Sequence, residues 1–447
     1  MLRNTDNTDF KFLRVSVTPW LMLFFPSLLY NPCTMNFNSL DQLPDPSAKR
    51  IALHVTAPAE RALRQGHPWV FDQSITEQSH EGAPGDLAVI FDNKRRFLAI
   101  GLYDPTSTIR VRVLQNRQPA TINAEWFQNK LQLAAQIREP LKGTDTTGYR
   151  LVHGENDGFP GLVIDCYADT LVLKLYTPAW IPHLKEFCSA LAQISPAEHL
   201  ILRLNRLLQK QTELLYGLND GMTLTPQTPP SLILFKENGL TFESDPILGQ
   251  KTGFFLDQRD NRAKVEALSK GKSVLNVFAY SGGFSVYAAR GGAREVVSVD
   301  ISPHAMESAI HNMAHNRHFP TVAAASHETF AEDAFDVLAR MESQKRFFDM
   351  VIIDPPMFAQ NEKQISSALA AYRKLTRLGL GVLRKGGTLV QASCSSRVDA
   401  DSFFDSIHQS AREAGRRLTE IERTGHALDH PITFEEGAYL KCLFATA

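Results

Sequence analysis

The chain has 447 residues, enough for two or three domains, and its 43% hydrophobic and 21% charged residues are ordinary for a globular protein. The formal net charge of −1 excludes a molecule that binds nucleic acid through its overall charge, so RNA affinity must come from local patches or from shape. Five cysteines without a C-x-x-C pair argue against a disulfide framework or a zinc site, and favour a reducing, cytoplasmic compartment.

Residues 1–34 differ in composition from the rest of the chain. The apolar run over residues 20–29 follows basic residues, as in a signal peptide, but Pro26 interrupts it and no A-x-A cleavage site follows. The run is also too short to span a bilayer, so we expect no membrane partner. We expect the true start at Met35, with an unfolded leader and linker over residues 1–50.

Residues 51–118 are typical of a small β-barrel made of short strands. Glycine, proline and Asp-Asn turns punctuate this segment at short intervals. The expected strands cover residues 51–55, 88–91, 97–103 and 109–114, and one short helix covers residues 59–65. Residues 51–115 hold seven basic and seven acidic side chains, so the module is not basic. Its one basic cluster, Lys94–Arg96, is more typical of a solvated turn than of a phosphate contact.

Residues 119–245 are expected to form an α+β domain that walls one side of a cleft. The expected helices cover residues 121–136 and 179–194, and the expected strands cover residues 162–167, 170–176, 200–204 and 232–237. Glu155 and Asp157 form an acid pair that could serve in catalysis. Because they lie in a G-E-x-D-G turn, where acidic side chains bond to nearby backbone N–H groups, we favour a structural role.

The last domain, residues 246–447, alternates strands and helices as a doubly wound α/β sheet does. The expected strands cover residues 274–278, 296–299, 321–326, 350–353, 388–392, 417–422 and 439–444. The expected helices cover residues 284–290, 303–316, 334–341, 364–383 and 401–414. The last two strands follow each other as in a hairpin, so we predict a Rossmann-like, seven-stranded sheet with one antiparallel strand at its edge.

The stretch from Val274 to Asp300 is a strand, a glycine turn, a helix, a strand and an acid. Glycines let a ligand approach the backbone, the helix start offers free N–H groups, and the acid can accept both hydroxyls of a ribose. The turn over residues 279–284 lacks the G-x-G-x-x-G pattern of dinucleotide enzymes, which disfavours a nicotinamide oxidoreductase. S-adenosylmethionine (SAM) has no phosphate and does not need this pattern, so the turn modestly favours SAM.

Two later strands deliver polar groups at the same edge of the sheet, where ligands bind in open α/β folds. Asp354 is followed by two prolines, which fix a rigid, extended loop. Cys394 is flanked by serines in the run Ser393–Ser396. A lone cysteine after a core strand is usually an inert small hydrophobe, but this polar turn is unlike a core and favours a nucleophile.

The segment Lys251–Arg262 leads into the last domain. Asp257, Arg259 and Arg262 fall at helical spacing after an apolar run. Taken alone, this spacing indicates a surface helix with intrahelical ion pairs.

The chain resembles a known family, the bacterial 23S ribosomal RNA cytosine-C5 methyltransferases with an N-terminal PUA module. The resemblance runs from about residue 51 to the C-terminus. It rests on six motifs in the family's order: GHPWVF (66–71), GENDGFPGLVID (154–165), KTGFFLDQRDNR (251–262), FAYSGGFS (278–285), DPPMF (354–358) and SCSS (393–396). It implies SAM as cofactor, large-subunit ribosomal RNA as partner, a PUA domain that binds RNA, and a cytoplasmic enzyme with a homodimer as one option.

The resemblance also implies roles for individual residues. The expected cofactor contacts are Asn276, Phe278, Tyr280, Ser281, Gly282, Asp300, Ile301, Ser302, Asp333, Asp354 and Pro355. Asp333 is placed to accept from the adenine amine, and it also fits a helix N-cap. Lys251 and Arg259 are expected to contact substrate, and Phe358 to stack on the target base after that base is flipped out.

Methylation of cytosine at C5 explains why Cys394 is needed. The ring carbon is a poor nucleophile until a thiolate adds to C6 and converts the ring into an enamine, which then attacks the methyl sulfonium. Asp354 is expected to hydrogen-bond the base at N3 and at its amine. Loss of the C5 proton and expulsion of the thiol finish the cycle, with Glu155, Asp257 and a water left open as the general base.

Two alternatives stay open at this point. Enzymes that methylate the amine of adenine or guanine carry an aromatic directly after D/N-P-P, whereas Met357 stands there in this chain. A catalytically inactive PUA-type RNA-binding protein is the second alternative, and the intact Asp300, Asp354 and Cys394 count against it. In one respect the chain departs from two-cysteine RNA C5 enzymes, because the D-P-P region holds no second cysteine.

Overall fold

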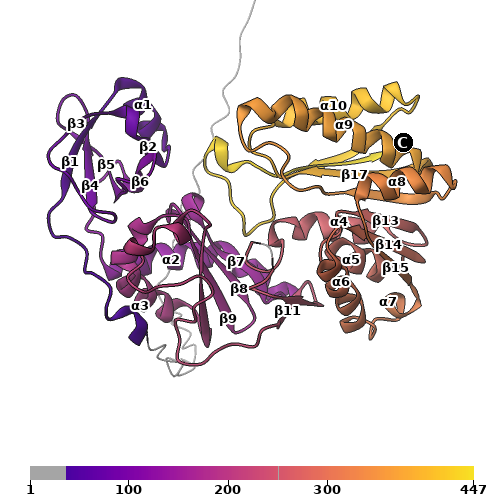
Figure 1. Ribbon diagram of the computed structural model, residues 1–447, viewed down its shortest axis with the longest axis horizontal. Coiled ribbons are helices and arrows are strands. Elements are labelled where there is room, and N and C mark those ends of the chain that lie inside the picture. Colours follow the sequence, from indigo (N-terminus) through magenta and orange to yellow (C-terminus); the bar gives the residue numbers. More distant parts are fainter. Residues whose placement is uncertain (1–36, 250) are drawn as a thin grey trace, which may run out of the picture. The chain divides into compact units, whose positions relative to one another are not determined.

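The computed structural model describes residues 37–249 and 251–447. The expected leader and the expected start at Met35 lie outside the described residues. The described chain builds three β-sheets and one separate hairpin, joined by helices (Figure 1). Among the described helices, none is both long and apolar enough to cross a membrane.

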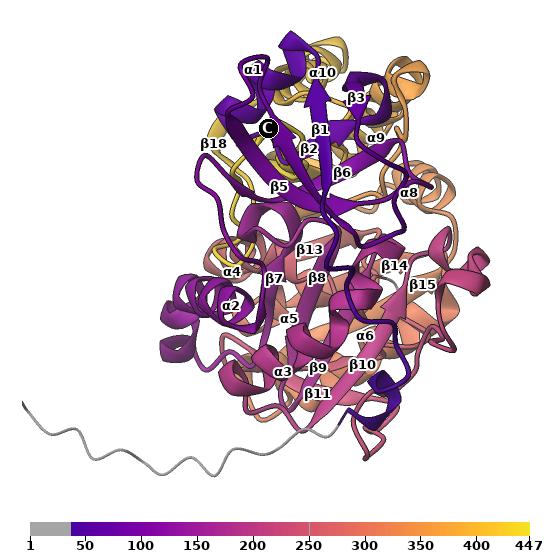
Figure 2. The ribbon, with the colours of Figure 1, turned by 90° about the vertical axis from the view of Figure 1, so that its left-hand side faces the viewer.

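A mixed six-stranded sheet forms the N-terminal module (Figure 2). Its strands follow the order β2-β6-β5-β4-β1-β3. The elements are β1 (Ile51–Val55), α1 (Ala57–Gln65), β2 (Trp69–Phe71), β3 (Ile75–Gln78), β4 (Leu87–Phe91), β5 (Phe97–Tyr103) and β6 (Ile109–Asn116). The four predicted strands are present. The prediction missed β2 and β3 because each is short and mostly turned toward solvent, which leaves little hydrophobic alternation to detect.

The middle of the chain forms a four-stranded sheet in the order β10-β9-β8-β7. Its elements are α2 (Ala124–Arg138), β7 (Gly148–His153), β8 (Leu162–Tyr167), β9 (Thr170–Leu175), α3 (Leu184–Ile194) and β10 (His199–Leu204). The predicted helix over residues 179–194 is divided into a 3-10 turn, Pro178–His183, and α3. Pro182 explains the division, because it cannot donate the hydrogen bond that a continuous α-helix needs.

The predicted strand over residues 232–237 does not belong to this sheet. It is β11 (Ile233–Glu237), which pairs antiparallel with β12 (Leu240–Ser244) in a separate hairpin. Asn238 and Gly239 form the turn, both with positive φ, at 49° and 78°. An Asn-Gly pair is a strong hairpin signal, so the sequence held the information that the prediction did not use.

The C-terminal sheet has seven strands in the order β15-β14-β13-β16-β17-β19-β18, which confirms the Rossmann-like prediction. Its strands are β13 (Ser273–Val277), β14 (Glu295–Asp300), β15 (Ser326–Ala331), β16 (Phe348–Ile353), β17 (Leu383–Ser393), β18 (Thr419–Thr424) and β19 (Lys441–Thr446). Its helices are α4 (Arg259–Leu268), α5 (Gly283–Arg290), α6 (Pro303–His315), α7 (Pro320–Ala324), α8 (Ala334–Ser343), α9 (Ile365–Gly381) and α10 (Ala400–Glu413).

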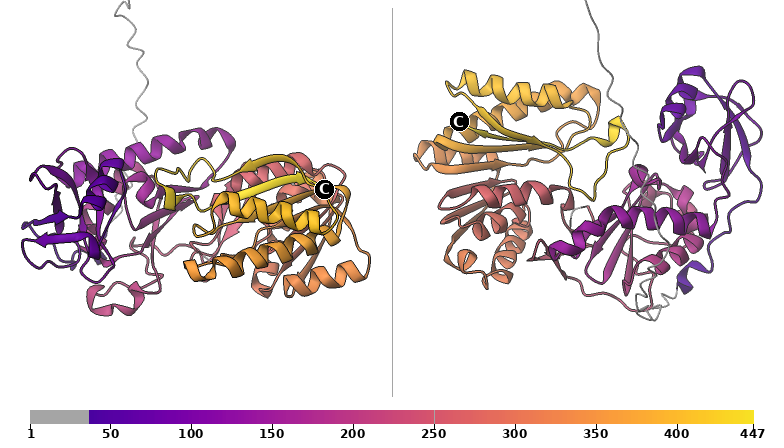
Figure 3. Two further views of the ribbon diagram at one scale, coloured as in Figure 1. Left: turned by 90° about the horizontal axis from the view of Figure 1, so that it is seen from above. Right: turned by 180° about the vertical axis from the view of Figure 1, so that it is seen from behind.

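Helices cover both faces of this sheet (Figure 3). Alternate residues of one strand enter different cores: Leu275 and Val277 pack with α8, α9 and α10, whereas Val274 packs with α4 to α7. Strands that are buried on both faces form continuous apolar runs, which is why the sequence marked them clearly.

Two predictions about this sheet are wrong. The expected strand over residues 321–326 is mostly α7, whose Pro320 stands in the first turn, and β15 begins only at Ser326. The antiparallel strand is not at the edge: β19 lies between β17 and β18 and is antiparallel to both. The burial explains this order, because the side chains of β19 are nearly all buried and those of β18 nearly all exposed. The domain limits near residues 118 and 245 stay a prediction.

Candidate active site

A cavity of about 360 Å³ lies where the parallel strands of the C-terminal sheet end. The residues at the ends of successive strands line it: Phe278, Ala279, Tyr280 and Ser281 after β13, Asp300 as the last residue of β14 with Ile301 after it, Asp333 after β15, Asp354, Pro355, Pro356 and Phe358 after β16, and Cys394 after β17. The sheet edge predicted to bind a ligand therefore carries a cavity that most of the predicted residues line.

The turn after β13 forms the floor of the cavity. Asp300 fixes it, because its two carboxylate oxygens accept from the backbone N–H groups of Tyr280 (2.9 Å) and Ser302 (3.0 Å). Phe278 and Tyr280 both have positive φ, at 60° and 46°, which is uncommon for bulky residues and often marks functional sites. The backbone is thus held in an unusual conformation at the position expected for the cofactor.

Three residues expected to touch cofactor do not line the cavity. Asn276 is fully buried in β13, where its amide donates to the hydroxyl of Ser285 (2.9 Å). Ser302 is the N-cap of α6, and it accepts from the N–H of Ala305 (3.2 Å). Gly282 has a φ of 75°, and a Cβ there would lie 2.8 Å from that of Ala309 in α6. Asn276 and Gly282 therefore shape the site from beneath its surface, and half-buried Ser302 shapes it from the start of α6.

The end of the cavity beside β15 is largely apolar. Ile301, which is 71% exposed, and Phe335 lie there, together with Asp333. Asp333 caps α8 by accepting from the N–H groups of Phe335 (2.8 Å) and Asp336 (3.3 Å). The N-cap prediction is confirmed, and the same carboxylate still faces the cavity.

Cys394 lies at the other end of the cavity in a firmly held turn. The Ser395 hydroxyl donates to the carbonyl of Ala359 (3.2 Å), and Nζ of Lys441 donates to the carbonyls of Ser395 and Val398. The thiol lies 3.8 Å from the carbonyl oxygen of Pro355, so the turn after β17 meets the loop after β16. The thiol faces the cavity and is not packed into the core.

The burial of this thiol favours its neutral form. Burial raises the pKa of Cys394 to about 11; nearby Asp354 and Asp257 act in the same direction, and Lys251 opposes them. Burial, reinforced by the charge of Asp257, also raises the pKa of Asp354 to about 7. The lowered thiol pKa expected of a nucleophile is therefore not present in the cavity as described, and a group that takes the thiol proton is needed.

Asp257 stands across the cavity in a different environment. Burial opposes its ionisation, but Lys251 and His430 outweigh burial and hold the pKa of Asp257 well below its usual range. Its Oδ2 accepts from Nζ of Lys251 (2.8 Å) and from the hydroxyl of Tyr439 (2.9 Å). Its Oδ1 is buried without a hydrogen-bond partner. Asp257 is thus held ionised, whereas the raised pKa of Asp354 leaves part of its population protonated near neutral pH.

Arg259 does not contact the cavity, which corrects the expected substrate contact. Its side chain is 1% exposed and donates to both carboxylate oxygens of Asp429, at 3.0 and 2.7 Å. Arg262 does line the cavity, and it pairs with Glu237 of β11 at 2.8 and 2.6 Å. The alternative of a surface helix with intrahelical pairs is also wrong, because both arginines are buried and pair with distant carboxylates.

Glu155 and Asp157 have the structural role that the turn suggested. Glu155 accepts from the indole N–H of Trp69 (3.0 Å) and from the N–H of Gly161 (3.1 Å). Asp157 pairs with Arg138 at 2.9 and 2.7 Å and accepts from the N–H of His153 (2.6 Å). Neither carboxylate lines the cavity.

The prediction missed the segment between β18 and β19, residues 425–440, which we call the return segment. Asp429 in this segment accepts from Arg259 and from the N–H of Arg150 (2.8 Å), and its carbonyl accepts from Arg138 (2.7 Å). The segment then brings Tyr439 to Asp257 and Leu440 to the cavity wall. It lacks regular structure apart from one 3-10 turn, so no periodicity marked it in the sequence.

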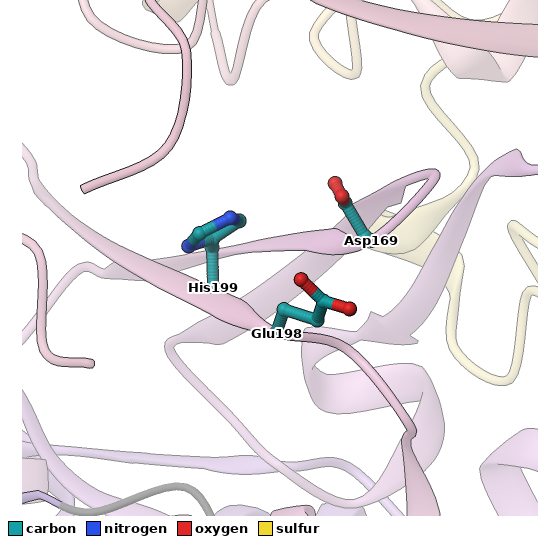
Figure 4. Close-up of side chains that lie close together, drawn as sticks. All are labelled: Asp169, Glu198 and His199. Carbon is teal, nitrogen blue, oxygen red and sulfur yellow. The ribbon is translucent and has the colours of Figure 1, made fainter. Parts of the chain in front are cut away.

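Among the described residues, one cluster has the spacing of a metal site: Asp169, Glu198 and His199, with ligand atoms within 4.8 Å of one another (Figure 4). Both acids are exposed, and Nδ1 of His199 is within hydrogen-bonding distance of the carbonyl of Gln227 (3.1 Å). An exposed acidic pair beside one imidazole is common without an ion, so we assign no metal role to it.

Comparisons with known proteins match this architecture. A family described as S-adenosylmethionine-dependent methyltransferase matches residues 150–445, and a PUA-like domain family matches residues 53–116. A ribosomal RNA large subunit methyltransferase from Deinococcus radiodurans is 46% identical over 406 residues, which cover 90% of this chain and 98% of that protein. A ribosomal RNA large subunit methyltransferase I from Photobacterium profundum is 35% identical, and the match covers 87% of this chain and 98% of that protein.

Among solved structures, a chain from Streptococcus mutans, provisionally described as a SAM-dependent methyltransferase, superimposes with a TM-score of 0.75. It is 24% identical, and the match covers 89% of this chain and 100% of that one. At this level of identity the likeness concerns the fold, and it extends through all three sheets and not only the C-terminal one.

Proposed function

The chain belongs to the S-adenosylmethionine-dependent methyltransferase family, here with an N-terminal PUA-like domain, and from this premise we propose that it methylates C5 of a cytosine in large-subunit (23S) ribosomal RNA. The names of its relatives support ribosomal RNA as the substrate. One observation carries the chemistry: the thiol of Cys394 and the carboxyl of Asp354 share one cavity with the glycine turn. Ribosomal RNA is then the partner, and the cytoplasm the compartment.

The described residues fit SAM at the end of the cavity between β13 and β15. Asp300 stands after the second strand, where a carboxylate can accept ribose hydroxyls, and Asp333 faces the place of an adenine amine. Phe278, Ile301 and Phe335 offer apolar faces to a purine ring. Bound there, SAM supplies a methyl group on a sulfonium.

Cys394 and Asp354 then divide the work on the base. As the sulfur of Cys394 forms a bond to C6, the electrons of the C5–C6 double bond move into the ring and N3 takes up a proton. Asp354 is suited to donate that proton, because burial keeps part of its population protonated near pH 7. In net terms the thiol proton passes to N3 with Asp354 as intermediary, and C5 becomes the nucleophile.

Phe358 and Lys251 are proposed to hold the flipped base in place. Phe358 lines the cavity and packs against Tyr372 with the ring centres 5.2 Å apart, so one face of a base could stack on it. Nζ of Lys251 lies over the ring of Phe255 (4.3 Å from its centre) and lines the same cavity. We propose that Lys251 contacts the base or its phosphate, and we no longer assign Arg259 to this role.

The identity of the methylated nucleoside tests the proposal. The purified full chain is incubated with protein-free large-subunit RNA and isotopically labelled SAM, and the digested RNA is analysed by mass spectrometry. We expect label in 5-methylcytidine. Label in a methylated amine of adenosine or guanosine would instead establish the base-amine alternative. An absence of transfer, with both RNA and SAM bound, would favour an inactive RNA-binding protein.

A further inference from the structure

The chemistry proposed above leaves one step without a residue. After methyl transfer, C5 of the adduct carries both a hydrogen and the new methyl group. The C5–H bond must break, its electrons must form the C5–C6 double bond, and the C6–S bond must break with the electron pair leaving on sulfur. N3 then gives up the proton that it took, which returns through Asp354 to the sulfur. This elimination restores the aromatic ring and requires a group in the cavity that accepts the C5 proton.

The surroundings of the acidic side chains separate the candidates. Asp354 already serves N3, and Glu155 lies outside the cavity with its Oε1 engaged by Trp69 and Gly161. Asp300 and Asp333 line the cavity, but backbone N–H groups at the proposed cofactor end engage them. These four carboxylates are therefore either committed to another contact or remote from the base.

Asp257 differs from all of them. Its Oδ2 is held by Lys251 and Tyr439, whereas its Oδ1 has no partner. Within residues 37–249 and 251–447, this is the one buried carboxylate oxygen without a hydrogen bond. A buried, unpaired anionic oxygen is costly, and such atoms recur at functional sites because a reacting group completes them.

We propose that Asp257 is the general base of the release step, and that its Oδ1 accepts the C5 proton of the methylated adduct. This inference rests on the proposed C5 mechanism. Lys251 and Tyr439 fix the orientation of the carboxylate. The positive charges of Lys251 and His430 keep it ionised, so it is ready to accept a proton whenever the adduct forms. A carboxylate of low basicity is sufficient, because departure of the sulfur and recovery of the aromatic ring drive the elimination.

The proposal predicts that Asp257→Asn transfers the methyl group but does not release the product. RNA carrying tritium at C5 of cytosine and SAM carrying a carbon-14 methyl group allow the two steps to be counted separately. In the unmodified enzyme, the ratio of tritium released to methyl transferred is one. In Asp257→Asn we expect this ratio to fall at least tenfold, multiple turnover to fall about 100-fold or more, and a covalent RNA–protein adduct to persist in denaturing gels.

Matched variants separate the failure of this inference from that of the mechanism it rests on. Glu155→Gln, which alters the other acid considered, should keep the ratio at one and accumulate no adduct. The double variant Cys394→Ala/Asp257→Asn should form no adduct. If the unmodified enzyme makes no 5-methylcytidine, or if Cys394→Ala is active, the underlying mechanism is wrong.

The base assignment alone is overturned if the mechanism holds but Asp257→Asn keeps a ratio of one, or if it loses methyl transfer without accumulating adduct. Tyr439→Phe covers the case in which Asp257→Asn does not fold. It removes one of the two donors to Oδ2 and leaves Oδ1 in place. For Tyr439→Phe we expect a ratio of tritium released to methyl transferred that lies between the ratio of the unmodified enzyme and that of Asp257→Asn. A ratio of one would contradict the assignment.

Discussion

Two regions build the walls of the cavity, and they hold their residues in different ways. At the carboxyl edge of the sheet, Asp354 and Cys394 each follow a buried strand, so backbone pairing a few residues away sets their positions. The return segment has almost no regular structure, and one ion pair and several hydrogen bonds to distant residues hold it in place. Removing the Cys394 thiol at the sheet edge should therefore change chemistry with little effect on folding, whereas removing the Asp429 carboxylate in the return segment should affect folding first.

The largest expected effect is a loss of methyl transfer, caused by a substitution at the carboxyl edge of the sheet. Cys394→Ala should lower methyl transfer at least about 1000-fold, because no other thiol lines the cavity described here. The affinity for SAM, measured by calorimetry, and the free energy of unfolding should change by less than about 1 kcal/mol. Substantial activity in this variant would rule out the covalent mechanism.

In the return segment, Asp429→Asn should lower the free energy of unfolding by about 3–5 kcal/mol, because it leaves Arg259 buried without a full counter-charge. Chemical denaturation measures this difference. Asp260→Asn is the matched control: Asp260 lies 3.5 Å from the same guanidinium but is exposed, so its loss should cost at most about 1 kcal/mol. Equal effects of the two variants would contradict the account of the return segment.

Asp354 sharpens the comparison, because its cost to stability depends on pH. Its pKa is raised in the folded chain to about 7, so the folded state holds a proton that the unfolded chain releases above about pH 4. The contribution of Asp354 to the free energy of unfolding is therefore fully present below about pH 4 and is lost as the pH rises from about 4 through 7.

Asp354→Asn should abolish the loss of folding stability between about pH 4 and pH 7, because asparagine does not ionise. At pH 8 the variant should be more stable than the unmodified chain by up to about 4 kcal/mol, and inactive, as expected when a site retains a costly group for function. Thermal unfolding of both proteins at pH 5 and pH 8 measures the effect. A variant that is less stable at pH 8 than the unmodified chain would show that Asp354 is a structural residue.

The smallest expected effect belongs to Gly282→Ala, at about 1–3 kcal/mol of stability. The alanine would combine an unfavourable φ of 75° with a Cβ 2.8 Å from that of Ala309. Because Gly282 adjoins Ser281 on the cavity floor, weaker SAM binding should accompany the loss. Gly386→Ala is a suitable control, since its φ is also 75° but nothing lies within 4 Å of the added Cβ. Equal stability losses would assign the whole effect to backbone strain.

The difference between the strand ends and the return segment also explains which parts of the site could be predicted from the sequence. Asp354, Cys394 and Asp300 could be predicted to share one edge because each ends or follows an apolar run and parallel strands end at one edge, and all three line the cavity there. Asn276, Ser302 and Gly282 were expected to line the site and do not line the cavity, because position along the chain does not distinguish a lining residue from a supporting one. Asp257 was recognised as a candidate base, but only the positions of its two oxygens separate it from Glu155.

Arg259 shows what could not be predicted. Its spacing from neighbouring charges matched a surface helix, yet its partner Asp429 lies 170 residues further along the chain. No local pattern marks a contact of that kind. The hairpin of β11 and β12 is the opposite case, because its Asn-Gly turn is a local signal that could have been used.

The most direct test of the central claim is to trap the thiol on the base. Large-subunit RNA transcribed with 5-fluorocytidine presents a C5 substituent that no base can remove as a proton, so the methylated adduct cannot be released. With SAM and the full chain, we predict a denaturation-resistant RNA–protein complex whose peptide map places the linkage at Cys394. Methylation of unmodified RNA without any such complex, or a linkage at another residue, would contradict the covalent mechanism.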